Sequence, residues 1–199
     1  MSNLVRILCY PLGLMIKSFG ITLMIRSRMG TDAWNSLYVG MYQQFGLTVG
    51  TWVIVFGVLI VLLNARMKRK KPDLFSLMTV LVLGLCIDFW LSILRLAPLE
   101  RTEQVLLFWA GLLCTCLGIS VYVQGRFGLT PCDELMYNLC HRFGLSLSAS
   151  KTVTDGCALL FALLLHGPIA LGTLIYTFLS GPLIQFFIPK IRRLFGKSR

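Results

Sequence analysis

GITLMIRSRMGTDAWNSLYVGMYQQFGLT, residues 20–48, returns in altered form as GISVYVQGRFGLTPCDELMYNLCHRFGLS, residues 118–146. The two stretches align without a gap at an offset of 98 positions, and glycines and an arginine hold the register. The identities that fix this alignment are Gly20 with Gly118, Arg28 with Arg126, Gly30 with Gly128, and Gly46 with Gly144. Unrelated helical segments would not share such residues in one register, so we interpret the repeat as an internal duplication.

The duplication extends beyond these two stretches. The match fades after them and resumes, one position out of step, at Gly84 and Gly181. Each copy therefore spans about half of the 199-residue chain. We assign residues 1–98 to a first repeat half and residues 99–199 to a second.

The composition is that of a membrane protein. Hydrophobic residues make up 56% of the chain, charged residues make up 14%, and the mean hydropathy is +0.78. These values lie outside the range of soluble globular domains. A net charge of +11 could suggest nucleic acid, but no recognition motif for it is visible, and the basic residues gather at the ends of apolar runs. We therefore expect the lipid bilayer as a partner, no nucleic acid, and one integral membrane domain.

Six apolar segments approach the length of about 20 residues that a membrane span requires. They lie at about residues 4–25, 47–65, 74–94, 104–123, 150–166 and 169–188. The first could imitate a signal peptide, but Lys17 interrupts its apolar run and no convincing cleavage site follows, so we expect a retained span. The sequence predicts an all-α membrane protein with about six transmembrane helices, three in each half.

The basic residues predict the orientation of these spans. With the N-terminus inside, fourteen of the nineteen Lys and Arg residues fall on the cytoplasmic side and four fall outside. Cytoplasmic loops carry such an excess, so we predict a multi-pass protein of the plasma (inner) membrane with both termini cytoplasmic. Because each half has an odd number of spans, the second half enters the membrane from the opposite side. The halves are thus predicted to be inverted-topology repeats.

A shorter, more polar segment follows the first span of each half, at residues 32–45 and 131–143. Thr130 suits a helix N-cap, and Gly46 and Gly144 suit the left-handed end of a helix. We therefore predict one extra short helix in each half. It is either an amphipathic helix lying in the membrane interface or a re-entrant helix lining a cavity. Gly-interrupted short segments at matching positions favour the re-entrant form.

The starts of these short helices are the predicted substrate-binding site, because their free N–H groups need partners that lipid cannot supply. The site residues are Thr31, Asp32, Asn35, Thr130, Cys132 and Asp133. A charge in hydrocarbon costs about 2.5–3.5 kcal/mol, so Asp88 and Asp155, with Gln185 as the repeat equivalent of Asp88, are expected to line the same polar interior. Two alternatives stay open. Lys151 can neutralise Asp155 as an i,i+4 ion pair, and all of these groups can form a structural polar core.

Motifs of membrane enzymes and of metal sites are missing from the sequence. There is no H-E-x-x-H or G-x-S-x-G motif. The seven cysteines include no C-x-x-C pair, and we interpret them as small buried hydrophobic residues. We therefore expect no enzyme activity, no metal site and no cofactor.

Three motifs together resemble a known family. They are GLTPCDEL at residues 128–135, the Phe-Gly-Leu-Thr/Ser endings of the two repeated stretches, and Gly-x-x-x-Asp-Phe beginning at Gly84. This pattern is similar to the YczE/YyaS/YitT group of small bacterial integral membrane proteins, over about residues 10–188. The resemblance implies a bacterial plasma membrane and little about a substrate. The first copy departs from the pattern, with Ala33 in place of the proline and Asn35 in place of the acid.

These features favour a transporter or permease for a small polar solute, either anionic or zwitterionic. Inverted repeats, paired short helices and carboxylates within spans point in that direction. The alternative is a non-transporting accessory or regulatory membrane protein, because a duplication by itself does not require transport. A chain of this size also leaves room for a homodimer.

Overall fold

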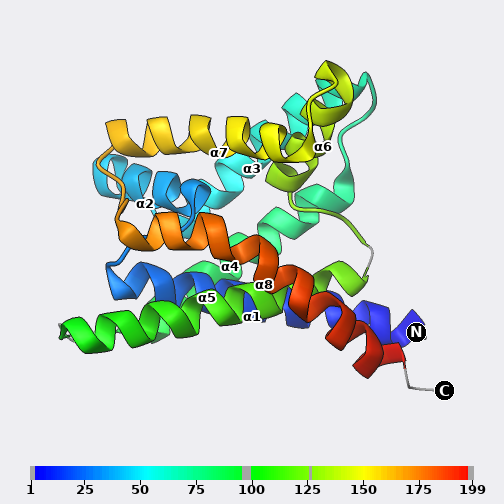
Figure 1. The fold of residues 1–199 in the computed structure, drawn as a ribbon. Helices are drawn as coiled ribbons and strands as arrows, with labels where there is room; N and C mark the ends of the chain where they lie inside the picture. The colour runs from blue at the N-terminus through cyan, green and yellow to red at the C-terminus, as the bar shows by residue number, and fades with distance from the viewer. Residues whose placement is uncertain (1–2, 96–99, 126, 197–199) are drawn as a thin grey trace. The chain divides into compact units, whose positions relative to one another are not determined.

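The computed structural model describes residues 3–95, 100–125 and 127–196, and all of their regular structure is helical. Figure 1 shows the helices in chain order. They are α1 (Asn3–Ser27), α2 (Ala33–Phe45), α3 (Val49–Lys68), α4 (Leu74–Ile93), α5 (Arg101–Gly125), α6 (Pro131–Phe143), α7 (Leu147–Leu164) and α8 (Leu171–Gly196). The prediction of an all-α chain is confirmed, and both short helices form almost at the predicted bounds.

The helices form two compact units, each built from both halves of the sequence. Unit 1 consists of Met1–Asp32, Cys86–Phe127 and Pro168–Arg199. Unit 2 consists of Ala33–Leu85 and Gly128–Gly167. Unit 1 therefore holds α1, α5, α8 and the end of α4, whereas unit 2 holds α2, α3, α6, α7 and the start of α4.

Five helices of the described chain are long and apolar enough to cross a membrane. Their apolar segments are Arg6–Ser27, Val49–Lys68, Leu74–Ile93, Arg101–Gly125 and Leu171–Leu194. They correspond to five of the six predicted spans. The remaining predicted span, residues 150–166, corresponds to α7, which is not among these five. The N-terminal half of α7 carries an ion pair between Lys151 and Asp155, with 2.8 Å between Nζ and Oδ2.

In unit 1, the equivalent helices α1 and α5 pack along one another (Figure 1). A Cβ atom added at Gly13 or Gly20 of α1 would lie less than 3.0 Å from backbone atoms of α5. The same is true of Gly111 and Gly118 of α5 against α1. Small residues allow two membrane helices to approach until their backbones touch, and these glycines recur every seven positions on each helix.

The contacts between α1 and α5 are reciprocal under the 98-residue offset. Gly13 faces Tyr122, and the equivalent pair, Gly111 and Met24, is also in contact. In the same way Gly20 faces Thr115, and Gly118 faces Lys17. The helices are therefore antiparallel. Exchanging the two copies reproduces the interface, which is the contact pattern that a two-fold axis produces.

In unit 2, the packing also pairs helices from different copies. Helix α2 packs against α7, and its equivalent α6 packs against α3, the equivalent of α7. Helix α6 ends at Gly144, whose φ of 65° lies in the left-handed region as predicted. Thr130 is the N-cap of α6, but its hydroxyl donates to the carboxylate of Asp133 at 2.6 Å and accepts no hydrogen bond from a backbone N–H group of the helix.

We predict that Gly118→Ala destabilises the protein by about 1–3 kcal/mol, because an added methyl group forces the two backbones apart. Thermal unfolding in a fixed detergent would show a lower midpoint. The matched control is Gly156→Ala in α7, where an added Cβ meets no atom within 4 Å. Both changes replace a helical glycine, so helix propensity favours alanine equally in the two variants. Equal midpoints for the two variants would show that the α1–α5 contact is not close.

Candidate functional site

A buried carboxylate lies in the first turn of the short helix α6. Glu134 is only 9% exposed, whereas the preceding acidic residue, Asp133, is half-buried. A carboxylate near a helix N-terminus is favoured by the helix dipole. Burial removes its hydration, however, so it needs polar partners from other helices.

Two other helices supply partners for Glu134. Lys68, in the last turn of α3, forms an ion pair with Oε1. On the other oxygen, Oε2, the amide of Asn64 approaches to 3.4 Å and the hydroxyl of Ser76 to 3.3 Å. Asn64 lies one turn before Lys68 on α3, and Ser76 lies in the first turn of α4. The carboxylate therefore links α6 to the end of α3 and the start of α4.

Asn64 connects the backbone and side chains of α6 to this carboxylate. Its Nδ2 donates to the carbonyl oxygen of Pro131 at 3.0 Å, and its Oδ1 accepts from the amide of Asn138 at 2.8 Å. Asn64 is 2% exposed and Asn138 is 8% exposed, so these bonds replace water that neither group can reach. We name Asn64, Lys68, Ser76, Glu134 and Asn138 the Glu134 cluster.

The Glu134 cluster reaches the surface of the protein through Lys68. The side chain of Lys68 is 41% exposed, whereas that of Glu134 is 12% exposed. A half-exposed ion pair contributes little to stability, because water competes with it. Lys68 is therefore the accessible end of the ion pair, whereas the carboxylate of Glu134 is buried and needs a partner.

The equivalent interface of the other copy has no such cluster. The 98-residue offset places Ser36 at the position of Glu134, Gly40 at that of Asn138, and Ala162 at that of Asn64. There the helices pack closely, and a Cβ added at Gly167 would lie against the carbonyl oxygen of Ser36. The two copies share one helix arrangement, and only the α3–α6 interface carries a buried carboxylate within the described residues.

Five residues of the predicted site lie in unit 2. Asn35 is 7% exposed and Thr130 is 6% exposed, whereas Cys132, Asp133 and Asp155 are half-buried. The hydroxyl of Tyr38 on α2 lies 3.8 Å from the sulfur of Cys132, and this contact brings the two short helices together. Asp155 pairs with Lys151, as the ion-pair alternative predicted.

The other four residues of the predicted site lie in unit 1. Thr31 is fully buried, Asp32 and Asp88 are half-buried, and Gln185 is exposed. The site was predicted from residues of both units, and its assembly stays a prediction. Lys17, which interrupts the apolar run of the first span, places its ammonium group 5.4 Å from the ring centroid of Tyr122. That contact is a cation–π interaction.

The prediction of the site missed every residue of the Glu134 cluster. It selected Asp133, but Glu134 is the acidic residue that turns into the protein. A signal was present in the sequence. Asn64 and Lys68 are four residues apart, as are Glu134 and Asn138, so each pair occupies one helix face. An asparagine within the apolar run of α3 also requires a buried polar partner.

We predict that Asn64→Leu destabilises the protein. Each buried polar group that loses its hydrogen bond to Asn64 lowers the free energy of unfolding by about 1–3 kcal/mol. A double-mutant cycle with Asn138→Leu isolates the interaction between the two amides. We expect the double variant to lose less than the sum of the single losses, with a coupling energy of about 0.5–3 kcal/mol. Unfolding midpoints of the four proteins in one detergent provide the measurement. Additive losses would show that the two side chains do not interact.

Comparison with known proteins places this chain in a family. The model of a family of unknown function, DUF6198, matches residues 4–189. The chain is 34% identical to the uncharacterised protein YyaS of Bacillus subtilis (strain 168) over 193 residues, which cover 96% of each chain. It is 31% identical to the uncharacterised membrane protein YczE of the same strain over 182 residues, covering 91% of this chain and 84% of YczE.

A more distant relative is an uncharacterised protein of Haemophilus influenzae, 27% identical over 181 residues, which cover 91% of this chain and 82% of the relative. No solved structure matches the chain. The chain is similar to a membrane protein and has five helices long and apolar enough to cross a membrane within the described residues. We therefore assign it to the multi-pass membrane proteins. The predicted resemblance to YyaS and YczE is confirmed, and the chain belongs to the DUF6198 family.

Proposed function

We propose that this protein is a permease of the bacterial plasma (inner) membrane that moves a small zwitterionic solute. The observation that carries this proposal is the Glu134 cluster. Burying a carboxylate is costly even when it has partners, and buried ionisable groups cluster at functional sites. A structural role alone would be met more cheaply by close packing, as at the equivalent interface around Ser36 and Gly167.

The charges of the Glu134 cluster favour a zwitterion over an anion. Its carboxylate and the ammonium group of Lys68 have opposite signs and are in contact. A solute that carries both charges can exchange with this pair, its ammonium group replacing that of Lys68 and its carboxylate binding Lys68 in turn. An anion gains only the second contact and is repelled by Glu134, which is why the proposal narrows the predicted solute class.

Six spans in two inverted halves form the scaffold of this proposal, with both termini in the cytoplasm. The reciprocal contacts of α1 and α5 support inversion, because copies related by a two-fold axis in the membrane plane would form such an antiparallel pair. Helix α7 is the sixth span. Its ion pair between Lys151 and Asp155 lowers the cost of placing both charges in the membrane.

We predict that a zwitterion stabilises the wild-type protein and not the variant Glu134→Gln. Glutamine keeps a hydrogen-bond acceptor for Asn64 and Ser76, so the variant is expected to fold while it lacks the charge that binds ammonium. The test is a thermal-shift panel of amino acids and betaines, with simple carboxylate anions for comparison. An active compound is then followed as radiolabelled uptake into proteoliposomes.

The matched control is Glu103→Gln, which removes a carboxylate from the exposed first turn of α5. This variant should respond to the same compounds as the wild type. If no zwitterion stabilises the wild type, or if Glu134→Gln responds fully, the permease proposal fails. The accessory or regulatory alternative would then account better for the chain.

A separate prediction concerns the position of α7. Single cysteines are introduced at two exposed positions after replacement of the seven natural cysteines, one at Ser148 in the first turn of α7 and one at Ala170 beyond its end. A membrane-impermeant thiol reagent added to intact cells should label the cysteine at position 170. It should label position 148 only after the membrane is opened. Labelling of both positions from one side would show that α7 does not cross the membrane.

A further inference from the structure

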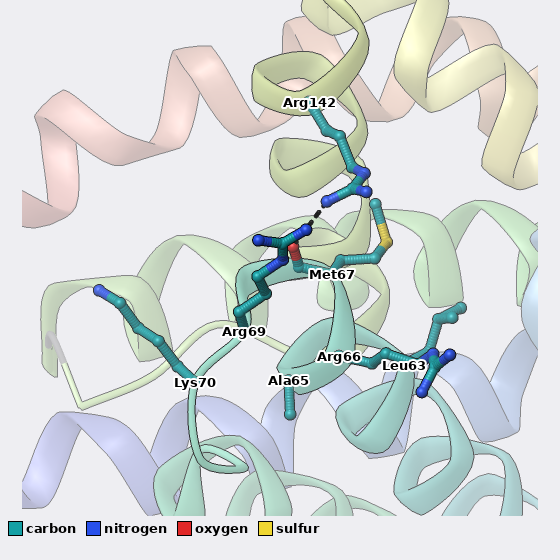
Figure 2. Close-up of a pocket in the computed structure, with 7 residues that line it drawn as sticks. All are labelled: Leu63, Ala65, Arg66, Met67, Arg69, Lys70 and Arg142. Atoms are coloured by element: carbon teal, nitrogen blue, oxygen red, sulfur yellow. Dashed lines mark hydrogen bonds between the residues drawn. The ribbon is translucent and has the colours of Figure 1, made fainter.

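A basic hollow opens at the C-terminal end of α3, and nothing in the proposed transport path uses it. The hollow has a volume of roughly 720 Å³. Figure 2 shows the residues that line it. Four of the lining residues are basic, namely Arg66, Arg69, Lys70 and Arg142, and three are apolar, namely Leu63, Ala65 and Met67. We name this set the basic hollow.

Its positive charge is not neutralised by nearby carboxylates within the described residues. The lining contains no acidic residue. Glu134 is paired with Lys68. Asp73 accepts a hydrogen bond from the N–H group of Phe75 at 3.0 Å. Glu134 is thus paired with Lys68 and Asp73 is bound at the start of α4, and no ion pair joins either carboxylate to a cation of the lining within the described residues.

The backbone at the end of α3 holds two of these cations in place. Arg69 ends the helix in the left-handed conformation, with φ of 53°. The N–H group of Lys70 donates to the carbonyl oxygen of Ala65 at 3.0 Å, which closes the turn. Arg69 and Lys70 therefore leave the helix at a fixed position, although an arginine in this conformation costs energy.

Arg142 approaches the same turn from α6. One of its guanidinium nitrogens donates to the carbonyl oxygen of Met67 at 3.1 Å, and Figure 2 shows the side chain of Arg69 reaching toward it. The carbonyl groups at the end of α3 already accept hydrogen bonds, among them the bond from Arg142 to Met67. Two guanidinium groups that face one hollow present a ready binding site for a phosphate, whose oxygens accept paired N–H bonds from arginine.

An apolar stripe on α3 leads to the basic hollow. Leu59, Leu62 and Leu63 are 55%, 50% and 46% exposed, and their spacing places them on one helix face, with Arg66 following a turn later. Val49–Lys68 is long and apolar enough to cross a membrane. Whichever side of the bilayer its C-terminal end faces, that end lies near the depth of the lipid headgroups. A free anion would make no contact with the apolar stripe, whereas the acyl chain of a lipid would cover it.

We propose that the basic hollow binds the phosphate of an anionic phospholipid, with an acyl chain lying along Leu59, Leu62 and Leu63. Basic pockets at the ends of spans recognise such headgroups through their charge. Binding would fasten the end of α3 to α6 through one phosphate shared by Arg69 and Arg142. This lipid is distinct from the transported solute, and the site does not depend on transport.

The test measures lipid binding to the purified full-length protein by native mass spectrometry, with phosphatidylglycerol and phosphatidylcholine as probes. The test variant is Arg69→Asn combined with Arg142→Gln, because asparagine tolerates the left-handed conformation at position 69. Each basic residue removed near a headgroup lowers affinity about fivefold, so the double variant should bind phosphatidylglycerol about 25-fold more weakly. Phosphatidylcholine should bind weakly to all proteins.

Two further variants complete the test. Arg192→Gln with Arg193→Gln removes the same charge from exposed positions at the end of α8 and should change affinity less than twofold. Arg66→Gln alone should weaken phosphatidylglycerol binding about fivefold, and it decides the matter if the double variant does not fold. The proposal is overturned by equal losses in the α8 control, by equal binding of both lipids, or by inorganic phosphate competing as well as phosphatidylglycerol.

Discussion

Backbone contact between α1 and α5 is the constraint on which unit 1 depends. At Gly13, Gly20, Gly111 and Gly118, a single methyl group would have to occupy space already taken by the partner helix. Lipid provides no hydrophobic force that drives helices together, so close packing of this kind must provide much of the attraction between them. The constraint also acts on both copies at once, because each glycine of one copy meets the equivalent surface of the other. This explains why Gly20 and Gly118 recur at matching positions of the duplicated sequence, whereas Gly46 and Gly144 recur because each has a positive φ.

Duplication supplied two similar interfaces in unit 2, and the two have since diverged in chemistry. The α2–α7 interface is close-packed around Ser36, Gly40 and Gly167. The α3–α6 interface instead buries Glu134 among amides and a hydroxyl. The two copies thus keep one helix arrangement but differ in the polarity of their interfaces. The sequence already hinted at this, since Ala33 and Asn35 replace the proline and the acid of the second copy.

The sequence predicted the helices well because their signals are local. Apolar length marks five of the six predicted spans, and polarity with cap residues marks both short helices. The site was harder to predict, because the choice between Asp133 and Glu134 depends on helix rotation. Successive residues of a helix point about 100° apart, and the rotation of α6 is set by its packing against α3, which sequence pattern alone does not give. Asn64 was overlooked although its place within the apolar run of α3 was a visible signal, because that signal does not identify its partners on α6.

The last turns of α3 separate two kinds of chemistry by helix phase. Asn64 and Lys68 are four residues apart and lie on the face toward Glu134. Leu59, Leu62, Leu63 and Arg66 fall on the opposite face, given about 100° per residue. One helix thus presents an inward polar face and an outward face that changes from apolar to basic at its end. An anionic lipid on the outer face would hold Arg142 against the end of α3, and Arg142 lies two turns beyond Glu134 on α6. The same two helices therefore carry both proposed sites, and a change in the angle between α3 and α6 would alter the two together.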